Sequence, residues 1–166
     1  IPGKWKPIAK KLIKKYKLNN NSKVLDIGCG KAFLLHEIKL LLPQISIYGF
    51  DVSKYAISKS TKLIKPFLKI AKAEEKYPYK KNFFDLSISI STLHNLEIFN
   101  LKKAFKEIER VSKNGYLVVE SYRNEKELFN LQCWALTCAS FFSKKEWEWI
   151  FKEYNYKGDY EFIYFR

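Results

Sequence analysis

Segment 24–32, with the sequence VLDIGCGKA, restricts the possible folds of this chain more than any other stretch. An apolar run carries Asp26 near its end, Gly28 and Gly30 follow, and apolar residues then recur at helical spacing over 33–42. This order predicts a strand, a tight turn and a helix. Glycine can adopt positive φ because it lacks a Cβ, and the first turn of the next helix offers free N–H groups. Such a turn is typical of a site for a nucleotide-like cofactor.

A second acidic residue, Asp51, supports this interpretation. It follows the next apolar run, 45–50, and lies 21 residues after Gly30. In doubly wound folds, an acid at the tip of the second strand accepts hydrogen bonds from ribose hydroxyls about 20 residues beyond the glycines. Either Asp26 or Asp51 alone could equally be a helix cap or a solvated loop charge. Together, in this order and at this spacing, they favour the cofactor site.

The residues after the two glycines distinguish between cofactors. A dinucleotide fingerprint, G-x-G-x-x-G, places a third glycine where bulky Phe33 stands, which disfavours a nicotinamide-dependent dehydrogenase. The stretch instead resembles the first motif of the class I S-adenosylmethionine-dependent methyltransferases, acid-x-Gly-x-Gly-x-Gly. Asp26, Gly28 and Gly30 match that motif, and Ala32 stands where its third glycine usually is.

The resemblance covers nearly the whole chain from Ser22 onward. It implies a three-layer α/β sandwich around a mostly parallel, doubly wound sheet, the Rossmann-like methyltransferase fold, with a short C-terminal half. It also implies S-adenosylmethionine as the cofactor and S-adenosylhomocysteine as the product. The segments 94–96, 122–124 and 136–138 resemble a subgroup of small bacterial methyltransferases whose substrate is unsettled, so the motifs identify the family but not the methyl acceptor.

The cofactor-binding residues follow from the same resemblance. The family usually places an acid that meets the adenine amino group just before the Ala73-Glu74 pair. Lys72 occupies that place here and cannot accept such a hydrogen bond, so we expect Ala73 or Glu74 to compensate. The residues predicted to hold the cofactor are Asp26, Gly28, Cys29, Gly30, Asp51, Val52, Ala73, Glu74 and Ser91.

Apolar periodicity predicts a single domain, 1–166, with the element order β-α-β-α-β-β-α-β-α-α-β after a leading helix. Ser53 and Ser143 are expected to cap two of the helices, Pro66 to stop one and Asn114-Gly115 to end another. The predicted strands are 24–27, 45–50, 67–71, 83–90, 116–120 and 160–165, and the predicted helices are 7–18, 33–42, 54–65, 101–111, 125–136 and the segment after Ser143.

The chain is strongly basic, with a net charge of +14 and 31 basic residues, of which only three are Arg. Because Arg is the residue favoured for bidentate phosphate and guanine contacts, its scarcity points to an AT-rich genome rather than to nucleic-acid binding. Residues 1–21 hold seven Lys and no acid, and form the predicted basic N-terminal helix. Such a helix can lie on RNA or on a membrane; docking on the domain with a solvated Lys face is the preferred alternative.

The three cysteines, Cys29, Cys133 and Cys138, form an odd set without a pair at metal-ligand spacing. This usage suggests free thiols in a reducing cytoplasm and predicts no metal site. We expect Cys29 to pack within the turn rather than to react. No apolar run approaches the roughly 20 residues that span a bilayer, and no signal peptide is recognised. The chain begins at Ile1 and contains no Met, which suggests N-terminal truncation; no pattern assigns an oligomeric state.

His94 and Glu120 are the candidate catalytic residues. His94 follows the predicted strand 83–90 and Glu120 ends the predicted strand 116–120, at the carboxyl edge where open α/β sheets bind ligands. His94 could contact the acceptor and take its proton, since an unperturbed imidazole has a pKa of about 6.5. Glu120 is the alternative base. The competing interpretation is that His94 only hydrogen-bonds its own loop.

Three further residues are candidates for acceptor contacts. Arg123 could hold a carboxylate or phosphate of the acceptor bidentately, or it could form a surface ion pair with Glu120 or Glu125. Tyr122 and Trp134 could wall the pocket or belong to the ordinary core.

Three functions fit these observations. The first, and preferred, is a methyltransferase for a small-molecule acceptor that offers a hydroxyl, amine or carboxylate. The second is an RNA or protein methyltransferase that docks through the Lys-rich N-terminus, so nucleic acid is a possible but less favoured partner. The third is a non-catalytic cofactor-binding partner subunit, which would fit the missing adenine acid and the short C-terminal half.

Overall fold

The computed structural model describes residues 3–166; Ile1 and Pro2, which begin the predicted domain and the predicted basic segment, lie outside the described residues. Within that range six strands form one sheet in the order β3-β2-β1-β4-β5-β6, and each neighbouring pair is parallel. The sheet is therefore doubly wound and fully parallel where a mostly parallel one was expected. The strands are β1 (Lys23–Ile27), β2 (Ser46–Asp51), β3 (Leu68–Ile70), β4 (Leu86–Ile90), β5 (Gly115–Ser121) and β6 (Asp159–Tyr164).

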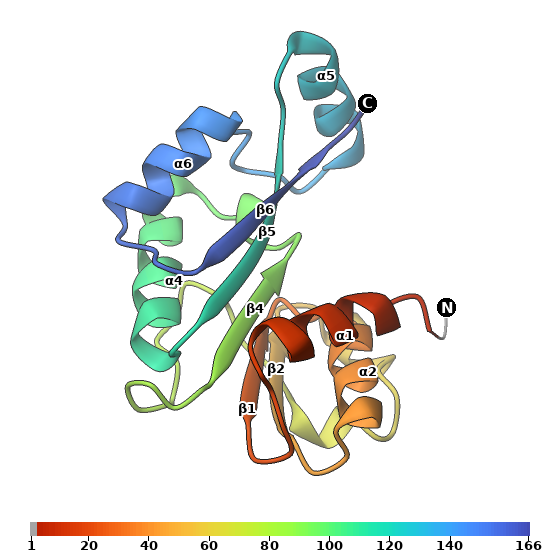
Figure 1. Cartoon of the computed structure of the whole chain (residues 1–166). Helices are drawn as coiled ribbons and strands as arrows, with labels where there is room; N and C mark the ends of the chain where they lie inside the picture. The colour runs from red at the N-terminus through yellow and green to blue at the C-terminus, as the bar shows by residue number, and fades with distance from the viewer. Residues whose placement is uncertain (1–2) are drawn as a thin grey trace.

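Helices cover both faces of the sheet, which gives the predicted three layers (Figure 1). The α-helices are α1 (Lys6–Lys15), α2 (Phe33–Leu41), α3 (Lys54–Ser58), α4 (Ile98–Val111), α5 (Glu125–Trp134) and α6 (Lys144–Glu153), and short 3₁₀ turns span Lys65–Phe67 and Leu93–Asn95. Strand β5 contributes side chains to two hydrophobic cores, one on each face of the sheet. Leu117 and Val119 pack with residues of α4 and α6, whereas Tyr116 and Val118 pack with residues of α1 and α2, because successive side chains of a strand point to opposite faces.

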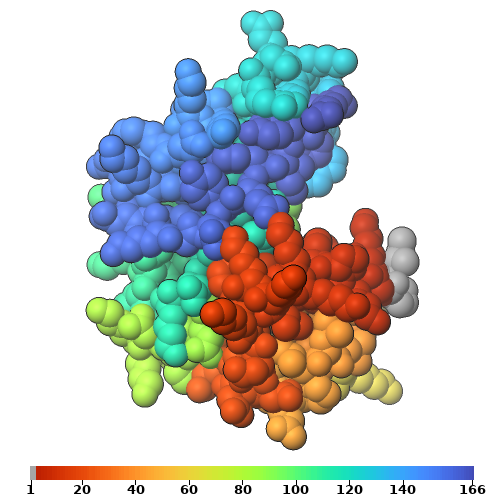
Figure 2. All heavy atoms as spheres, viewed as in Figure 1, coloured from red at the N-terminus to blue at the C-terminus, as the bar shows by residue number. Residues whose placement is uncertain are grey.

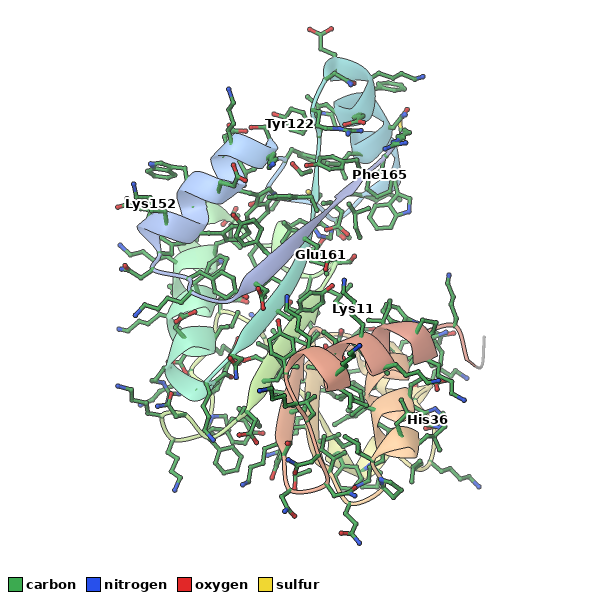
Figure 3. All side chains as sticks on the ribbon, viewed as in Figure 1. Lys11, His36, Tyr122, Lys152, Glu161 and Phe165 are labelled. Carbon is green, nitrogen blue, oxygen red and sulfur yellow. The ribbon has the colours of Figure 1, made fainter. Side chains whose placement is uncertain are left out.

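Helix α1 docks across the sheet toward its far edge. Ala9 and Leu12 are buried, Lys11 pairs with Glu161 of β6 at 2.5 Å, and Lys15 pairs with Asp159 at 3.0 Å. Figure 3 shows Lys11 and Glu161 facing each other from the two elements. Helix α1 therefore docks on the domain, as favoured, although Lys11 and Lys15 have acidic partners where a solvated Lys face was expected.

The local elements differ from the predictions at several ends. The predicted helix 54–65 is only α3, which ends at Ser58. The hydroxyls of Ser58 and Ser60 donate to the carbonyls of Tyr55 and Ile57, both at 2.7 Å, and such local bonds compete with helix continuation.

Other boundaries shift for similar local reasons. The N-terminal helix stops at Lys15 instead of 18, since Lys17 takes a φ of 52°. The fourth strand begins at Leu86 instead of 83, with Phe84 making an isolated bridge to Ser112. Among the described helices, none has the length and apolar character needed to cross a membrane.

Candidate cofactor and acceptor site

The carboxyl ends of β1 and β2 lie side by side. Ile27 is in register with Phe50, and the N–H groups of Gly28 and Cys29 both donate to the Phe50 carbonyl, at 2.9 and 3.0 Å. The glycine turn is therefore attached to the end of β2, beside Asp51. This places the two acids and the two glycines that the sequence singled out at one edge of the sheet.

The two glycines of the turn differ in what surrounds them. Gly28 has a φ of +71°, and a Cβ there would lie 2.1 Å from Thr92 Oγ1, whose hydroxyl donates to the Gly28 carbonyl at 3.2 Å. Gly30 has a φ of +55°, and a Cβ there would meet no described atom within 4 Å. Gly28 is thus required by protein packing, whereas Gly30 presents bare backbone to open space that a ligand can fill.

This difference predicts unequal effects of two alanine substitutions. Gly28→Ala is expected to destabilise the fold by about 2–5 kcal/mol, because Thr92 must move and the positive φ adds the left-handed backbone penalty. Gly30→Ala is expected to cost only the left-handed backbone penalty of about 1–2 kcal/mol, but its methyl group would obstruct cofactor binding. Urea unfolding and calorimetric titration with S-adenosylhomocysteine separate the two effects. Equal stability of Gly28→Ala and wild type would contradict the packing role.

Ala32 stands at the place of the motif's third glycine and retains the glycine conformation. Its φ is 56°, in the left-handed region, where it caps the N-terminus of α2, and its N–H donates to the Cys29 carbonyl at 2.8 Å. The residue is 1% exposed, and that burial offsets part of the backbone penalty. Ala32 therefore adopts the left-handed conformation that a glycine would favour at this position.

Asp51 ties the glycine turn to the start of α3. Its Oδ2 accepts from the Gly30 N–H at 2.8 Å and its Oδ1 accepts from the Ser53 N–H at 2.8 Å. Each carboxylate oxygen keeps lone-pair capacity for a further donor, such as a ribose hydroxyl.

A first cavity, which we call the cofactor cleft, opens beside Asp51 and has a volume of about 430 Å³. Seven of the nine predicted cofactor residues line it, and Lys72 is exposed outside it. Glu74 is half-buried in its wall. The lining comprises Gly28, Gly30, Phe50, Asp51, Val52, Ala71, Ala73, Glu74, Ser91, Thr92, Asn95, Leu96 and Thr137.

A second cavity of about 310 Å³, which we call the chamber, shares three residues with the cleft and contains the other two predicted cofactor residues, Asp26 and Cys29. Gly28, Gly30 and Ser91 form the junction between the two spaces. The chamber lining comprises Trp5, Asp26, Gly28, Cys29, Gly30, Lys31, Phe33, Leu34, Ile90, Ser91 and Trp134.

The electrostatics of the chamber centre on Asp26, whose residue is 5% exposed. Burial raises the pKa of its carboxyl to about 7, and the nearby Asp51 adds to the effect. Burial likewise raises the pKa of the Cys29 thiol, with Asp26 and Asp51 contributing. Cys29 therefore stays a protonated thiol, as expected for a packing residue. Asp26, by contrast, is a buried acid that a cationic ligand would stabilise in its charged form.

His94 and Glu120 are brought together, but inside the protein. Glu120 Oε2 contacts His94 Nδ1, with the side chain of Glu120 fully buried and that of His94 4% exposed. Apart from this contact, neither Glu120 oxygen nor His94 Nδ1 has a hydrogen-bond partner within residues 3–166. The His94 ring lies 6.5 Å from the ring of Trp134, measured between centroids, and Trp134 lines the chamber. The pair is thus adjacent to the chamber wall, although neither residue is part of the described lining.

Arg123 and Tyr122 lie elsewhere than predicted. Arg123 is held by Glu127, with Nε donating to Oε2 at 3.0 Å, and its guanidinium stacks 4.3 Å from the ring centroid of Tyr164. The ion-pair alternative is correct in kind, but the partner is Glu127 instead of Glu120 or Glu125. Tyr122 is half-buried, and burial and Glu146 of α6 raise its pKa. In the described chain neither residue lines the cleft or the chamber, so their predicted acceptor contacts have no support from the geometry.

Sequence reasoning missed several residues at the site, three of which are Trp5, Phe33 and Thr92. Trp5 was treated only as part of a basic segment, Phe33 only as an obstacle to a dinucleotide, and Thr92 was given no role. A signal existed for Phe33, since the first helical position after a glycine turn faces whatever the turn binds. The sequence contains no comparable signal for Trp5, which comes from a segment outside the motif.

Comparisons with known proteins agree with this geometry. Residues 18–155 match a family described as "Methyltransferase domain". The chain is 28% identical over 109 residues to the mouse mitochondrial arginine-hydroxylase NDUFAF5, covering 66% of this chain and 31% of that protein. It is 33% identical over 127 residues to the Arabidopsis thaliana tRNA (carboxymethyluridine(34)-5-O)-methyltransferase, covering 75% of this chain and 29% of that protein. The chain therefore spans about a third of the length of these curated relatives.

Solved structures show the same fold. The YcgJ protein of Bacillus subtilis superposes with a TM-score of 0.71 at 20% identity, covering 88% of this chain and 66% of that one. The glycine turn, the acid at the tip of β2 and the parallel sheet agree with the match over residues 18–155. The chain belongs to the class I S-adenosylmethionine-dependent methyltransferases.

Proposed function

We propose that this domain transfers the methyl group of S-adenosylmethionine to a small-molecule acceptor that offers a hydroxyl, amine or carboxylate. The observation that carries the proposal is the junction between the cofactor cleft, which has acidic side chains in its lining, and the chamber, whose lining is largely apolar. The cofactor cleft carries Asp51 and Glu74, the chamber is walled largely by apolar side chains, and they meet at Gly28, Gly30 and Ser91. Such a junction suits a polar cofactor on one side and an acceptor on the other.

The residues of the cleft fit the cofactor. Asp51 would accept from ribose hydroxyls, Glu74 would accept from the adenine amino group, and the bare backbone at Gly30 leaves room at the turn. Asp26 would face the ammonium group of the methionine part. When bound, S-adenosylmethionine supplies an electrophilic methyl group on a sulfonium leaving group. The chain's own contribution is to align the acceptor and to exclude water.

The buried pair supplies a path for the acceptor's proton. For a hydroxyl or amine acceptor, the S–CH₃ bond breaks, an O–CH₃ or N–CH₃ bond forms, and one proton leaves the acceptor. In this proposal His94, whose ring lies 6.5 Å from that of Trp134 in the chamber wall, takes this proton through Nε2, and Glu120 stabilises the resulting imidazolium from the Nδ1 side. A carboxylate acceptor would need no base, and His94 would then only hold its loop through its carbonyl, which accepts from Ala139 and Ser140.

Replacing Asp51 by alanine tests the cofactor part of the proposal. Asp51→Ala is expected to weaken S-adenosylmethionine binding about ten- to a hundredfold, because hydrogen bonds to a charged group are each worth about 1.5–3 kcal/mol. Calorimetry measures the affinity. Asp159→Ala, which removes an acid at the other end of the sheet, is the matched control and should bind normally. Unchanged affinity of Asp51→Ala would reject Asp51 as the ribose ligand.

RNA is the second candidate acceptor, favoured by the tRNA methyltransferase among the relatives and by the exposed Lys6, Lys10 and Lys14 of α1. Binding through these lysines would weaken steeply with salt, because each neutralised phosphate releases counterions. A gel-shift titration at 50 and 200 mM salt distinguishes the two acceptors. The third possibility, a non-catalytic partner subunit, predicts cofactor binding without methyl transfer to any acceptor.

A further inference from the structure

The chamber is walled by aromatic side chains that come from distant parts of the chain. Trp5 precedes α1, Phe33 begins α2 and Trp134 ends α5. In the space-filling view of Figure 2 the surface is hollowed on the right-hand side, between α1 below and the lobe of α5 and the end of β6 above. The chamber therefore lies between two parts of the fold, with one indole contributed from each.

Two of the aromatic walls are exposed, and one of them, Trp134, is held in place by its neighbours. Trp134 is 54% exposed and Phe33 is 39% exposed. The ring of Trp134 packs against that of Phe165, with centroids 4.6 Å apart, and Asn130 of α5 donates to the Phe165 carbonyl at 3.3 Å. Large apolar side chains that stay exposed around a cavity, while their backs are supported, mark a surface that is covered by a ligand.

The charged side chains in the chamber lining are those of Asp26 and Lys31. Under the proposed function Asp26 belongs to the charged end of the cofactor, and Lys31 Nζ lies 5.8 Å from the ring centroid of Tyr55, which does not line the chamber. The large apolar walls are the rings of Trp5, Phe33 and Trp134, with Leu34 and Ile90. A charged acceptor placed against these walls would lose hydration without gaining a partner, whereas a flat ring gains stacked or edge-on contacts with them.

We propose that Trp5, Phe33 and Trp134 form the acceptor subsite, and that its ligand is a planar, uncharged aromatic small molecule bearing the hydroxyl or amine that is methylated. This inference rests on the proposed function, because it assigns the Asp26 end of the chamber to the cofactor. It specifies which class of small molecule the site takes.

A matched pair of probes tests the subsite. 2-Naphthol and decahydro-2-naphthol share a skeleton and a hydroxyl, but only the first is planar and aromatic. Titrated calorimetrically into protein saturated with S-adenosylhomocysteine, 2-naphthol is expected to bind at least tenfold more tightly. Trp134→Ala should weaken 2-naphthol binding at least tenfold, and Phe33→Leu, which keeps an apolar side chain but removes the ring, at least threefold. Trp149→Ala is the control, since Trp149 is 57% exposed on α6 and should leave both affinities unchanged.

The outcomes separate this inference from the function on which it rests. Equal affinity for the two probes, or an unchanged 2-naphthol affinity in Trp134→Ala, would overturn the planar subsite. A loss of S-adenosylhomocysteine affinity in Trp134→Ala, with 2-naphthol binding intact, would assign Trp134 to the cofactor and overturn it too. Displacement of 2-naphthol by a single-stranded RNA decamer at low micromolar concentration would assign the rings to an RNA base instead. Failure of wild type to bind S-adenosylhomocysteine would refute the proposed function, whatever the probes do.

Discussion

Replacement of His94 by alanine is expected to destabilise the protein by about 3–5 kcal/mol, the cost of leaving a buried charge without its partner. Glu120 is fully buried and its Oε2 contacts His94 Nδ1, an arrangement that requires a proton between the two atoms. Apart from this contact, neither Glu120 oxygen has a hydrogen-bond partner among the described residues. Removing the imidazole would therefore strand a carboxylate in the interior, and urea unfolding at neutral pH measures the loss.

A double-mutant cycle attributes this loss to the pair. Glu120→Gln removes the charge but keeps the size, so the double variant His94→Ala, Glu120→Gln should recover much of the stability lost in His94→Ala. If the two substitutions are simply additive, the pair does not interact and the contact has no energetic role. His36, which lies half-buried on α2, provides the control, since His36→Ala should change stability by less than about 1 kcal/mol.

The cycle also distinguishes catalysis from structure. If His94 takes the acceptor's proton, the refolded double variant should remain inactive toward a hydroxyl acceptor although its stability has recovered. If His94 only holds the 135–140 segment through its carbonyl, recovery of stability should restore methyl transfer. A general base typically accelerates a reaction about 10²- to 10⁴-fold. The rates of methyl transfer expected of the double variant under the two alternatives therefore differ by a large factor.

The sequence contained enough local information to locate the cofactor edge of the sheet. Asp26, Gly28, Gly30 and Asp51 could be placed because a strand, a turn and the next strand tip are each determined by residues close in sequence. All nine predicted cofactor residues line the cleft or the chamber; their roles in binding stay predictions.

The acceptor side could not be predicted in the same way. The position of a residue at the carboxyl end of a strand shows which edge of the sheet it occupies. It does not show on which face of the sheet its side chain lies. Arg123 failed as a predicted acceptor ligand because Asn124 caps α5 and places Glu127 one helical turn from Arg123. Trp5 and Trp134 meet the same cavity only through the docking of α1 and α5, which is a tertiary event with no local signal.

The site acid Asp26 is expected to reduce the stability of the cofactor-free protein at neutral and alkaline pH. Burial raises its pKa to about 7 in the folded chain, against about 3.9 in an unfolded one. The folded state therefore holds the proton more tightly. The resulting stabilisation is complete below about pH 4 and is lost as the pH rises through about 7.

Replacing Asp26 by asparagine removes this pH dependence. A shift of about three pKa units corresponds to as much as about 4 kcal/mol, so Asp26→Asn should be more stable than wild type by up to that amount at pH 8 and nearly equal to it at pH 4. Urea unfolding at the two pH values measures the difference. Asp159→Asn is the control, because the hydrogen bond from Tyr16 lowers the pKa of Asp159 and its removal should give no gain at pH 8.

The same substitution should weaken cofactor binding, although it stabilises the cofactor-free protein. A cationic ligand group beside Asp26 favours the charged carboxylate, so wild type should bind S-adenosylmethionine more tightly as the pH rises from 6 to 8 and should release a proton on binding at pH 6. Asp26→Asn should bind more weakly, with an affinity that no longer changes over this range. Calorimetry in buffers of different ionisation enthalpy measures the proton release. If Asp26→Asn is more stable than wild type at pH 8 and binds S-adenosylmethionine with the same affinity, the charge of Asp26 does not contribute to cofactor binding. The end of the chamber at Asp26 would then not hold the cofactor.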